Sequence, residues 1–165
     1  MAYCMGFAGY SGSGKTTLVT QLVVEMKRRG FRVAVIKHDA HGHYKEAAGA
    51  DSTLFIEAGA DAVVTISPNQ VNHVVKQQNT DLQEELKAYT HVDYIFVEGF
   101  KMEKHPKIAV FRTIEQSEII PRLDPKPVAI ATDLNNHHLE YIALDLNDIC
   151  SVADFVEQFF VVSPF

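Results

Sequence analysis

A glycine-rich motif near the start of the chain constrains the fold more than any other feature. Residues 9–16 read GYSGSGKT, which matches G-x-x-x-x-G-K-[ST] in full. An apolar run over Tyr3–Ala8 precedes the motif, and apolar residues at helical spacing follow it from Leu18 to Met26. In this order the backbone N–H groups of the loop and the positive end of the helix face the same point. The motif therefore predicts a phosphate-binding loop rather than a turn that only connects strand to helix.

The residues of the glycine-rich motif have different expected roles. Lys15 reaches the β- and γ-phosphates of a nucleotide, and the hydroxyl of Thr16 is the expected ligand of a Mg²⁺ ion that bridges them. Thr17 adds a contact to the α-phosphate. The remaining candidate phosphate contacts come from the backbone of Gly9, Gly12, Ser13 and Gly14.

The order of apolar runs predicts an α/β fold. A second run over Phe31–Ile36 follows the first helix within about 35 residues, which makes a right-handed βαβ unit with parallel strands. We expect a mostly parallel central sheet flanked by helices, in one domain over residues 1–165. An antiparallel hairpin at the sheet edge is expected from Ala62–Ile66 and Val71–Val75, separated by a turn. Further strands are expected at Tyr94–Val97, Ile108–Phe111, Val128–Ala131 and Tyr141–Leu144.

Composition excludes several classes of protein. The formal net charge of −6 disfavours binding to nucleic acid. The 2 cysteines show no spacing typical of a disulfide framework or a four-ligand zinc site, which favours a reducing cytoplasm. We see neither a secretory signal nor an apolar stretch of the roughly 20 residues that span a membrane.

Glu98 is the expected acidic partner of the phosphate loop. It follows four apolar residues of a buried strand, so it is predicted to lie at the carboxyl edge of the sheet, where the phosphate loop also opens. A carboxylate there holds Mg²⁺ or positions a water at the γ-phosphate. The alternative is a solvated acid at the end of a strand. We predict Lys15 and Glu98 as the catalytic residues, and Thr16 and Glu98 as magnesium ligands.

A histidine-rich turn over residues 37–43 begins where the second strand is expected to end. In one interpretation Lys37 and Asp39 contact phosphate or magnesium, while His38 and His41 bind a second ligand. A transition-metal site built from three histidines and a solvated loop are the alternatives.

The identity of the base is not fixed by a motif. The guanine-reading N-K-x-D pattern is absent, and the nearest candidate is Asp133 at the end of a predicted strand. In one interpretation its carboxylate accepts hydrogen bonds from the N1 and N2 edge of guanine. In the other, Asp133 only stabilises a turn.

Taken together, these motifs resemble those of the MobB family. The resemblance rests on the phosphate loop, the IKH turn with His41, the pair Asp51 and Ser52, the VEGF segment at 97–100 and the KIAVFR segment at 107–112. It covers nearly the whole chain. It implies a P-loop NTPase-like fold and a GTP-binding protein with weak GTPase activity. It also implies a homodimer that assists a MobA-type nucleotidyltransferase in attaching GMP to molybdopterin.

The resemblance assigns residues as well. It implies a Walker-B-like role for Glu98, and contact with phosphate or the pterin ligand for a further set: Lys37, His38, His41, Asp51, Ser52, Lys107 and Arg112. We expect slow turnover, because no arginine is evident in or next to the phosphate loop. The hairpin around Val63–Val75 is the expected dimer interface.

Two other functions remain open at this point. One is an ATP-dependent small-molecule kinase, whose phosphate loop would look the same and whose lid would use Arg112 and Arg122. The other is a metallochaperone GTPase that carries its ion on the cluster from His38 to His43.

Overall fold

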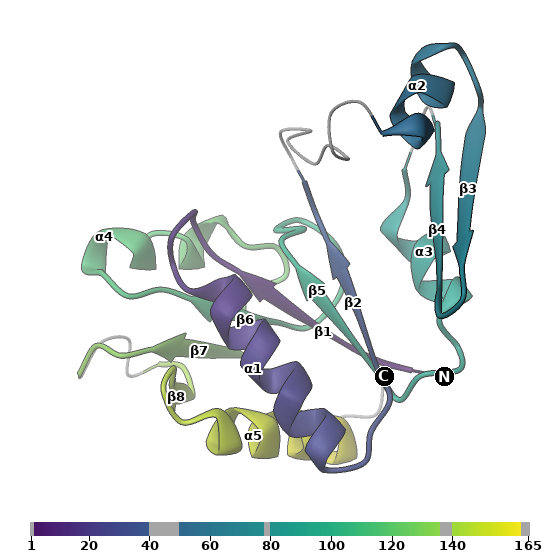
Figure 1. The fold of residues 1–165 in the computed structure, drawn as a ribbon. Coiled ribbons are helices and arrows are strands. Elements are labelled where there is room, and N and C mark those ends of the chain that lie inside the picture. Colours follow the sequence, from purple (N-terminus) through teal and green to yellow (C-terminus); the bar gives the residue numbers. More distant parts are fainter. Residues whose placement is uncertain (1, 40–49, 78–79, 136–139, 163–165) are drawn as a thin grey trace. The chain divides into compact units, whose positions relative to one another are not determined.

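The computed structural model describes residues 2–39, 50–77, 80–135 and 140–162 (Figure 1). The chain divides into two compact units, a larger one from Met1–His38 with Leu82–Phe165 and a smaller one from Asp39–Asp81. The larger unit contains a six-stranded sheet, and the smaller one contains a two-stranded sheet. The expectation of one domain over 1–165 stays a prediction.

The larger unit alternates strands and helices. Its strands are β1 (Tyr3–Ala8), β2 (Val33–Lys37), β5 (Tyr94–Glu98), β6 (Lys107–Val110), β7 (Ala129–Thr132) and β8 (Ala143–Asp145). Its helices are α1 (Lys15–Arg28), α3 (Leu82–Ala88), α4 (Ile114–Ser117), the 3₁₀ turn η1 (Ile120–Arg122) and α5 (Ile149–Val162).

The six-stranded sheet has the order β2-β5-β1-β6-β7-β8, and each of its strand pairs is parallel. The α/β prediction is therefore confirmed. Because the strands are parallel, all their carboxyl ends lie along one edge of the sheet. That edge receives the loop between β1 and α1, which joins the centre of the sheet to the helix in front of it (Figure 1).

Alternating side chains build a separate core on each face of the sheet. Met5, Phe7 and Phe96 pack with Leu18 and Leu22 of α1 and with α5 on one face (Figure 1). The other face has two clusters, one under α4 and η1 and one with Leu82 of α3. The parity of β5 therefore turns Tyr94, Phe96 and Glu98 toward the face that α1 covers.

An ion-pair network fastens α1 to α5. Arg29 follows α1 and donates to Asp154 and Glu157 of α5, each at 2.6 Å, and to Glu25 at 2.8 Å. Hydrogen bonds from Arg28 and Arg29 hold the pKa of Glu25 at about 2. The network fixes the C-terminal end of α1, which is far along the helix from the phosphate loop.

The smaller unit contains α2 (Asp51–Glu57), β3 (Ala62–Ser67) and β4 (Gln70–Val75). The antiparallel pairing of the predicted hairpin is confirmed, from Ala62 with Val75 to Ser67 with Gln70, but its expected place at the edge of the central sheet is not. It forms a two-stranded sheet of its own.

Two short helical segments follow β6. Thr113 caps α4 by accepting a hydrogen bond from the Gln116 N–H at 3.2 Å, and η1 follows with Pro121 in its first turn. The sequence analysis missed this capping signal. The expected strand at Tyr141–Leu144 is shorter and later, at Ala143–Asp145.

Candidate functional site

The glycines of the phosphate loop are required by close packing and by backbone conformation. A Cβ atom at Gly9 would overlap the Val110 carbonyl oxygen of the neighbouring strand. Gly14 has φ +91° and precedes the first residue of α1, and a Cβ there would lie 2.9 Å from Arg112 Nε. The loop therefore runs close to the sheet and enters α1 through a left-handed glycine, while the Ser13 N–H donates to the Tyr10 carbonyl oxygen at 3.2 Å.

Lys15 is held over the loop that precedes it. Its ammonium donates to the Tyr10 carbonyl oxygen at 2.7 Å. Burial lowers the pKa of Lys15, the carboxylate of Glu98 raises it, and the positive charges of Lys101 and Lys37 lower it. Glu98 therefore partly offsets the effect of burial on Lys15.

Thr16 and Glu98 meet at the start of α1. The Thr16 hydroxyl donates to the two carboxylate oxygens of Glu98, at 3.0 Å and 3.1 Å. Glu98 is 8% exposed at the end of β5, and Lys37 Nζ lies 3.7 Å from its Oε1. A hydroxyl and a carboxylate are the hard oxygen donors that Mg²⁺ prefers, so this pair fits that ion. The proximity agrees with the position expected for Glu98.

The turn after β2 lies beside the end of β5. Lys37 is in register with Glu98, and the His38 N–H donates to the Glu98 carbonyl oxygen at 2.9 Å. The His38 ring stacks on Phe100, with ring centroids 4.3 Å apart and an angle of 21° between the planes. Phe100 has φ +46°, a strained conformation for an aromatic residue and one that clusters at functional sites.

Arg112 and Asp133 lie on the other side of the phosphate loop. Arg112 Nη1 donates to Asp133 Oδ2 at 2.8 Å, and its Nε faces Gly14. The premise that no arginine is next to the phosphate loop was therefore wrong. The error arose because Arg112 is distant from the loop in sequence and reaches it only through the pairing of β6 with β1.

Lys107 is fully buried at the start of β6. Its ammonium donates to the carbonyl oxygens of Lys101, Glu103 and Asp124, at 2.9 Å, 2.8 Å and 2.9 Å. An ammonium has three N–H donors, so these contacts use all of them. In this arrangement Lys107 organises two loops and offers no donor to a phosphate.

Four other candidate residues fall outside the larger unit or outside the described residues. Asp51 and Ser52 lie together in the first turn of α2 and, with Phe55 and β3, line a shallow hollow of the smaller unit. Asp39 belongs to that unit too. His41, like His43, lies outside the described residues.

The sequence analysis missed part of the neighbourhood of the phosphate loop. Tyr10 carries Lys101 and Arg122 over its ring, and His105 is buried beside Lys107. Thr17 is exposed on α1, and the Ser13 hydroxyl is buried without a hydrogen-bond partner in the described part of the chain. Of these features, the sequence indicated only one: Tyr10 is an aromatic residue within the glycine motif, and an aromatic ring can bind cations.

The described residues contain neither a cluster of metal-binding side chains nor a membrane-spanning helix. Within residues 2–39, 50–77, 80–135 and 140–162, no three His, Cys, Asp or Glu side chains gather as a metal-binding group. In the same ranges no helix has the length and apolar character needed to cross a membrane.

Comparison with known proteins adds independent information. A family profile described as "Molybdopterin guanine dinucleotide synthesis protein B", MobB, matches residues 4–133. The chain is 37% identical over 159 residues to a molybdopterin-guanine dinucleotide biosynthesis adapter protein of Haemophilus influenzae, covering 93% of this chain and 87% of that protein. It is 33% identical over 162 residues to the adapter protein of the same name from Escherichia coli, covering 93% and 91%.

A solved structure agrees with these relatives. A crystal structure of a molybdopterin-guanine biosynthesis protein B superposes with a TM-score of 0.77 at 25% sequence identity, covering 94% of this chain and 99% of that one. The fold is therefore shared over nearly the full length of both chains.

Proposed function

Because the chain belongs to the MobB family, we propose that it is an adapter in molybdopterin-guanine dinucleotide biosynthesis that binds GTP with Mg²⁺ at the phosphate loop. It hydrolyses GTP weakly and assists a MobA-type nucleotidyltransferase in attaching GMP to molybdopterin. The names of the curated relatives support the pathway and the adapter role. The nucleotide, the hydrolysis and the partner are the finer parts of the proposal.

The contact between Thr16 and Glu98 carries the nucleotide proposal. It joins the last residue of the glycine motif to the acid at the end of the neighbouring strand, at 3.0 Å. Lys15 stands beside this pair with a backbone contact that a β- or γ-phosphate would replace. Thr16 and Glu98 would hold Mg²⁺, and the ion would neutralise charge on the phosphates.

The ion pair of Arg112 with Asp133 supports a guanine site. Arg112 holds Asp133 Oδ2, while Oδ1 has no hydrogen-bond donor among the described residues. A carboxylate fixed in this way presents an acceptor to the N1 and N2 edge of guanine. The same ion pair offsets the charge of Arg112, so we still expect slow hydrolysis in the absence of a partner.

Contacts to the pterin ligand are assigned first to Lys37 and His38, at the carboxyl end of β2. The His38 ring stacks on Phe100, and the neighbouring Lys37 is exposed. Aromatic rings can stack on a flat ligand ring, and the lysine can pair with an anionic group of that ligand. His41, Asp51 and Ser52 complete the proposed set. Lys107 belongs to the proposal only as a residue that positions loops, because its ammonium is fully engaged.

The homodimer is proposed on the exposed apolar surface of the smaller unit. Leu54, Phe55 and Ile66 are 53%, 59% and 77% exposed, and Val64, Val71 and Val75 are each about half exposed. A surface of this kind is typical of protein–protein contact. Light scattering of the purified chain tests this part: we expect the mass of a dimer, reduced to that of a monomer by Ile66→Lys. A wild-type monomer at micromolar concentration would contradict it.

The hydrolysis proposal is tested by Glu98→Gln, which keeps the shape of the side chain and removes its charge. We expect GTP turnover well below the roughly 1–100 s⁻¹ of kinases in the wild type, a further loss in Glu98→Gln, and a smaller change in GTP affinity. Glu118→Gln, an exposed glutamate after α4, is the matched control. Equal turnover in both variants would exclude Glu98 from the reaction.

A further inference from the structure

The ring of Tyr10 carries two cations that come from different loops. Tyr10 is the second residue of the glycine motif, and its half-buried side chain packs against the cluster that contains Phe111 and Ile119. Lys101 Nζ lies 5.1 Å from the centroid of the ring, and Arg122 Cζ lies 5.7 Å from it. Both distances are in the range of cation–π contacts. Two positive charges are thus gathered over one residue of the phosphate loop.

The loops that carry these cations are tied together below the surface. The buried ammonium of Lys107 bonds to the Lys101 and Glu103 carbonyl oxygens in one loop and to the Asp124 carbonyl oxygen in the other. The Asp124 N–H also donates to the Lys101 carbonyl oxygen, at 3.2 Å. The backbone that presents Lys101 and Arg122 is therefore fixed without a ligand, a preorganisation that lowers the entropic cost of binding.

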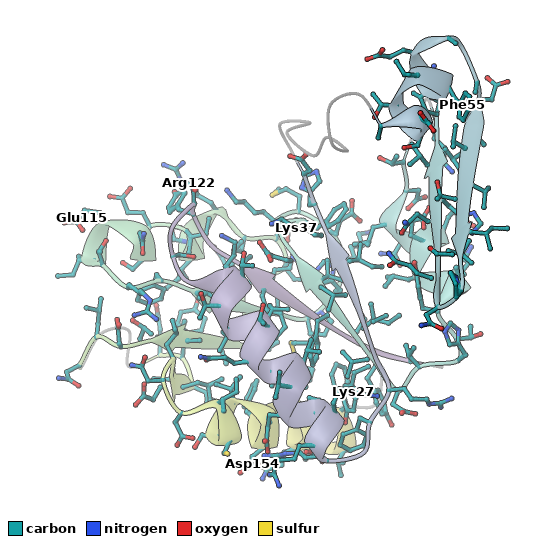
Figure 2. All side chains as sticks on the ribbon, in the orientation of Figure 1. Lys27, Lys37, Phe55, Glu115, Arg122 and Asp154 are labelled. Atoms are coloured by element: carbon teal, nitrogen blue, oxygen red, sulfur yellow. The ribbon has the colours of Figure 1, made fainter. Side chains whose placement is uncertain are left out.

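Neither cation is neutralised by a carboxylate of the described residues. Both side chains belong to exposed residues, and in the described ranges no carboxylate forms an ion pair with either of them. Lys101 lies over Tyr10, whose carbonyl oxygen accepts the hydrogen bond from Lys15. Arg122 stands next to the loop that joins β1 to α1, at the same edge of the sheet as Lys37 (Figure 2). Such a pair, in a chain with net charge −6, is a local site for an anion.

We propose that Lys101 and Arg122, held over Tyr10 by the Lys107 contacts, form a second phosphate-binding subsite next to the one that Lys15 serves. This inference rests on the proposed nucleotide site. Arginine and lysine side chains donate charge-assisted hydrogen bonds to phosphate oxygens. The flexible lysine and the planar arginine can both donate to one phosphate group. The phosphate comes either from the far end of the bound nucleotide or from a separate phosphate monoester beside it.

The test uses a double variant, Lys101→Met with Arg122→Met, which keeps most of the aliphatic packing on Tyr10 and removes both charges. Lys27→Met with Lys104→Met is the matched control. It removes the same charge from two exposed residues. Lys27 is at the C-terminal end of α1 (Figure 2), and Lys104 is in the loop after β5.

Calorimetry measures GTP and GDP affinity, and then the affinity of inorganic phosphate for the GDP-saturated protein. We expect the double variant to bind GDP as the wild type does and to lose about tenfold in one of the other two affinities. A loss of GTP affinity identifies the terminal phosphate as the ligand, and a loss of phosphate affinity identifies a separate monoester. Unchanged affinity for both, or an equal loss in the control, would overturn the proposal.

Failure of the nucleotide proposal gives a different result. If the wild type binds neither GTP nor GDP, the proposed function is wrong, and inorganic phosphate is then titrated into Lys15→Ala with and without the double substitution. A weaker phosphate affinity in the triple variant supports the subsite, and equal affinities overturn it.

Discussion

Protonation of His105 should destabilise the chain well above the pH at which its carboxylates titrate. The ring is 5% exposed and packs against Gly6, where a Cβ atom would overlap Nε2. Neither ring nitrogen has a hydrogen-bond partner in the described part of the chain. Burial, with the positive charge of Lys107 as a second cause, lowers the pKa of His105 from 6.5 to about 4. Between about pH 6.5 and pH 4, His105 is therefore mostly protonated in the unfolded chain and mostly neutral in the folded chain.

The sign and size of the effect follow from this difference. The folded-state pKa is depressed, so the stability that neutral His105 contributes is complete above about pH 6.5 and is lost as the pH falls toward 4. Integrating between pH 7 and pH 5 gives a loss of about 2 kcal/mol in the free energy of unfolding. Glu25 and Asp93 each have a pKa of about 2, so their contributions to stability are lost below pH 5 and change little between pH 7 and pH 5.

Urea unfolding followed by circular dichroism at pH 7 and pH 5 measures the loss. His105→Leu removes the titrating group, so its stability at pH 7 changes through packing while the difference between the two pH values shrinks. His91→Asn, an exposed histidine in the same unit, should keep the full difference. A wild-type chain with equal stability at both pH values would refute the reasoning, as would an unchanged difference in His105→Leu.

Three further substitutions have effects that the structure fixes. Lys107→Met removes three hydrogen bonds of a buried ammonium and should lower the free energy of unfolding by about 2–4 kcal/mol in a urea titration. Gly9→Ala should lower the melting temperature by several degrees, because its Cβ overlaps the Val110 carbonyl group; a melt equal to wild type would contradict this contact. Arg112→Ala should cost less than about 1 kcal/mol of stability, since its ion pair with Asp133 is partly exposed, yet weaken GTP binding. Loss of stability without loss of affinity would make Arg112 a structural residue.

The elements nearest the phosphate loop were predictable because their signals are local. The glycine motif fixes the turn from β1 to α1, and the apolar run that ends in Glu98 fixes a parallel strand with its acid at the carboxyl edge. The parity of that strand turns Glu98 toward Thr16. Helix and strand periodicity in the two elements was therefore enough to bring the two side chains together.

The cations around the loop were not predictable in the same way. Lys101, Lys107 and Arg122 come together through loops whose paths depend on one buried ammonium and its three carbonyl partners. Sequence alone gives no spacing rule for such contacts. The family resemblance implied a ligand contact for Lys107, yet it is the first residue of a fully buried strand, and that position was the available hint of a structural role.

The central claim is that the phosphate loop binds GTP in preference to other nucleotides. A calorimetric titration with GTP, ATP and CTP in the presence of Mg²⁺, with Lys15→Ala as control, tests it most directly. We predict a preference for GTP of about tenfold or more, equivalent to about 1.4 kcal/mol, that is lost in the control. A preference for ATP would contradict the account and favour a kinase, and unchanged GTP affinity in Lys15→Ala would show that the nucleotide binds elsewhere.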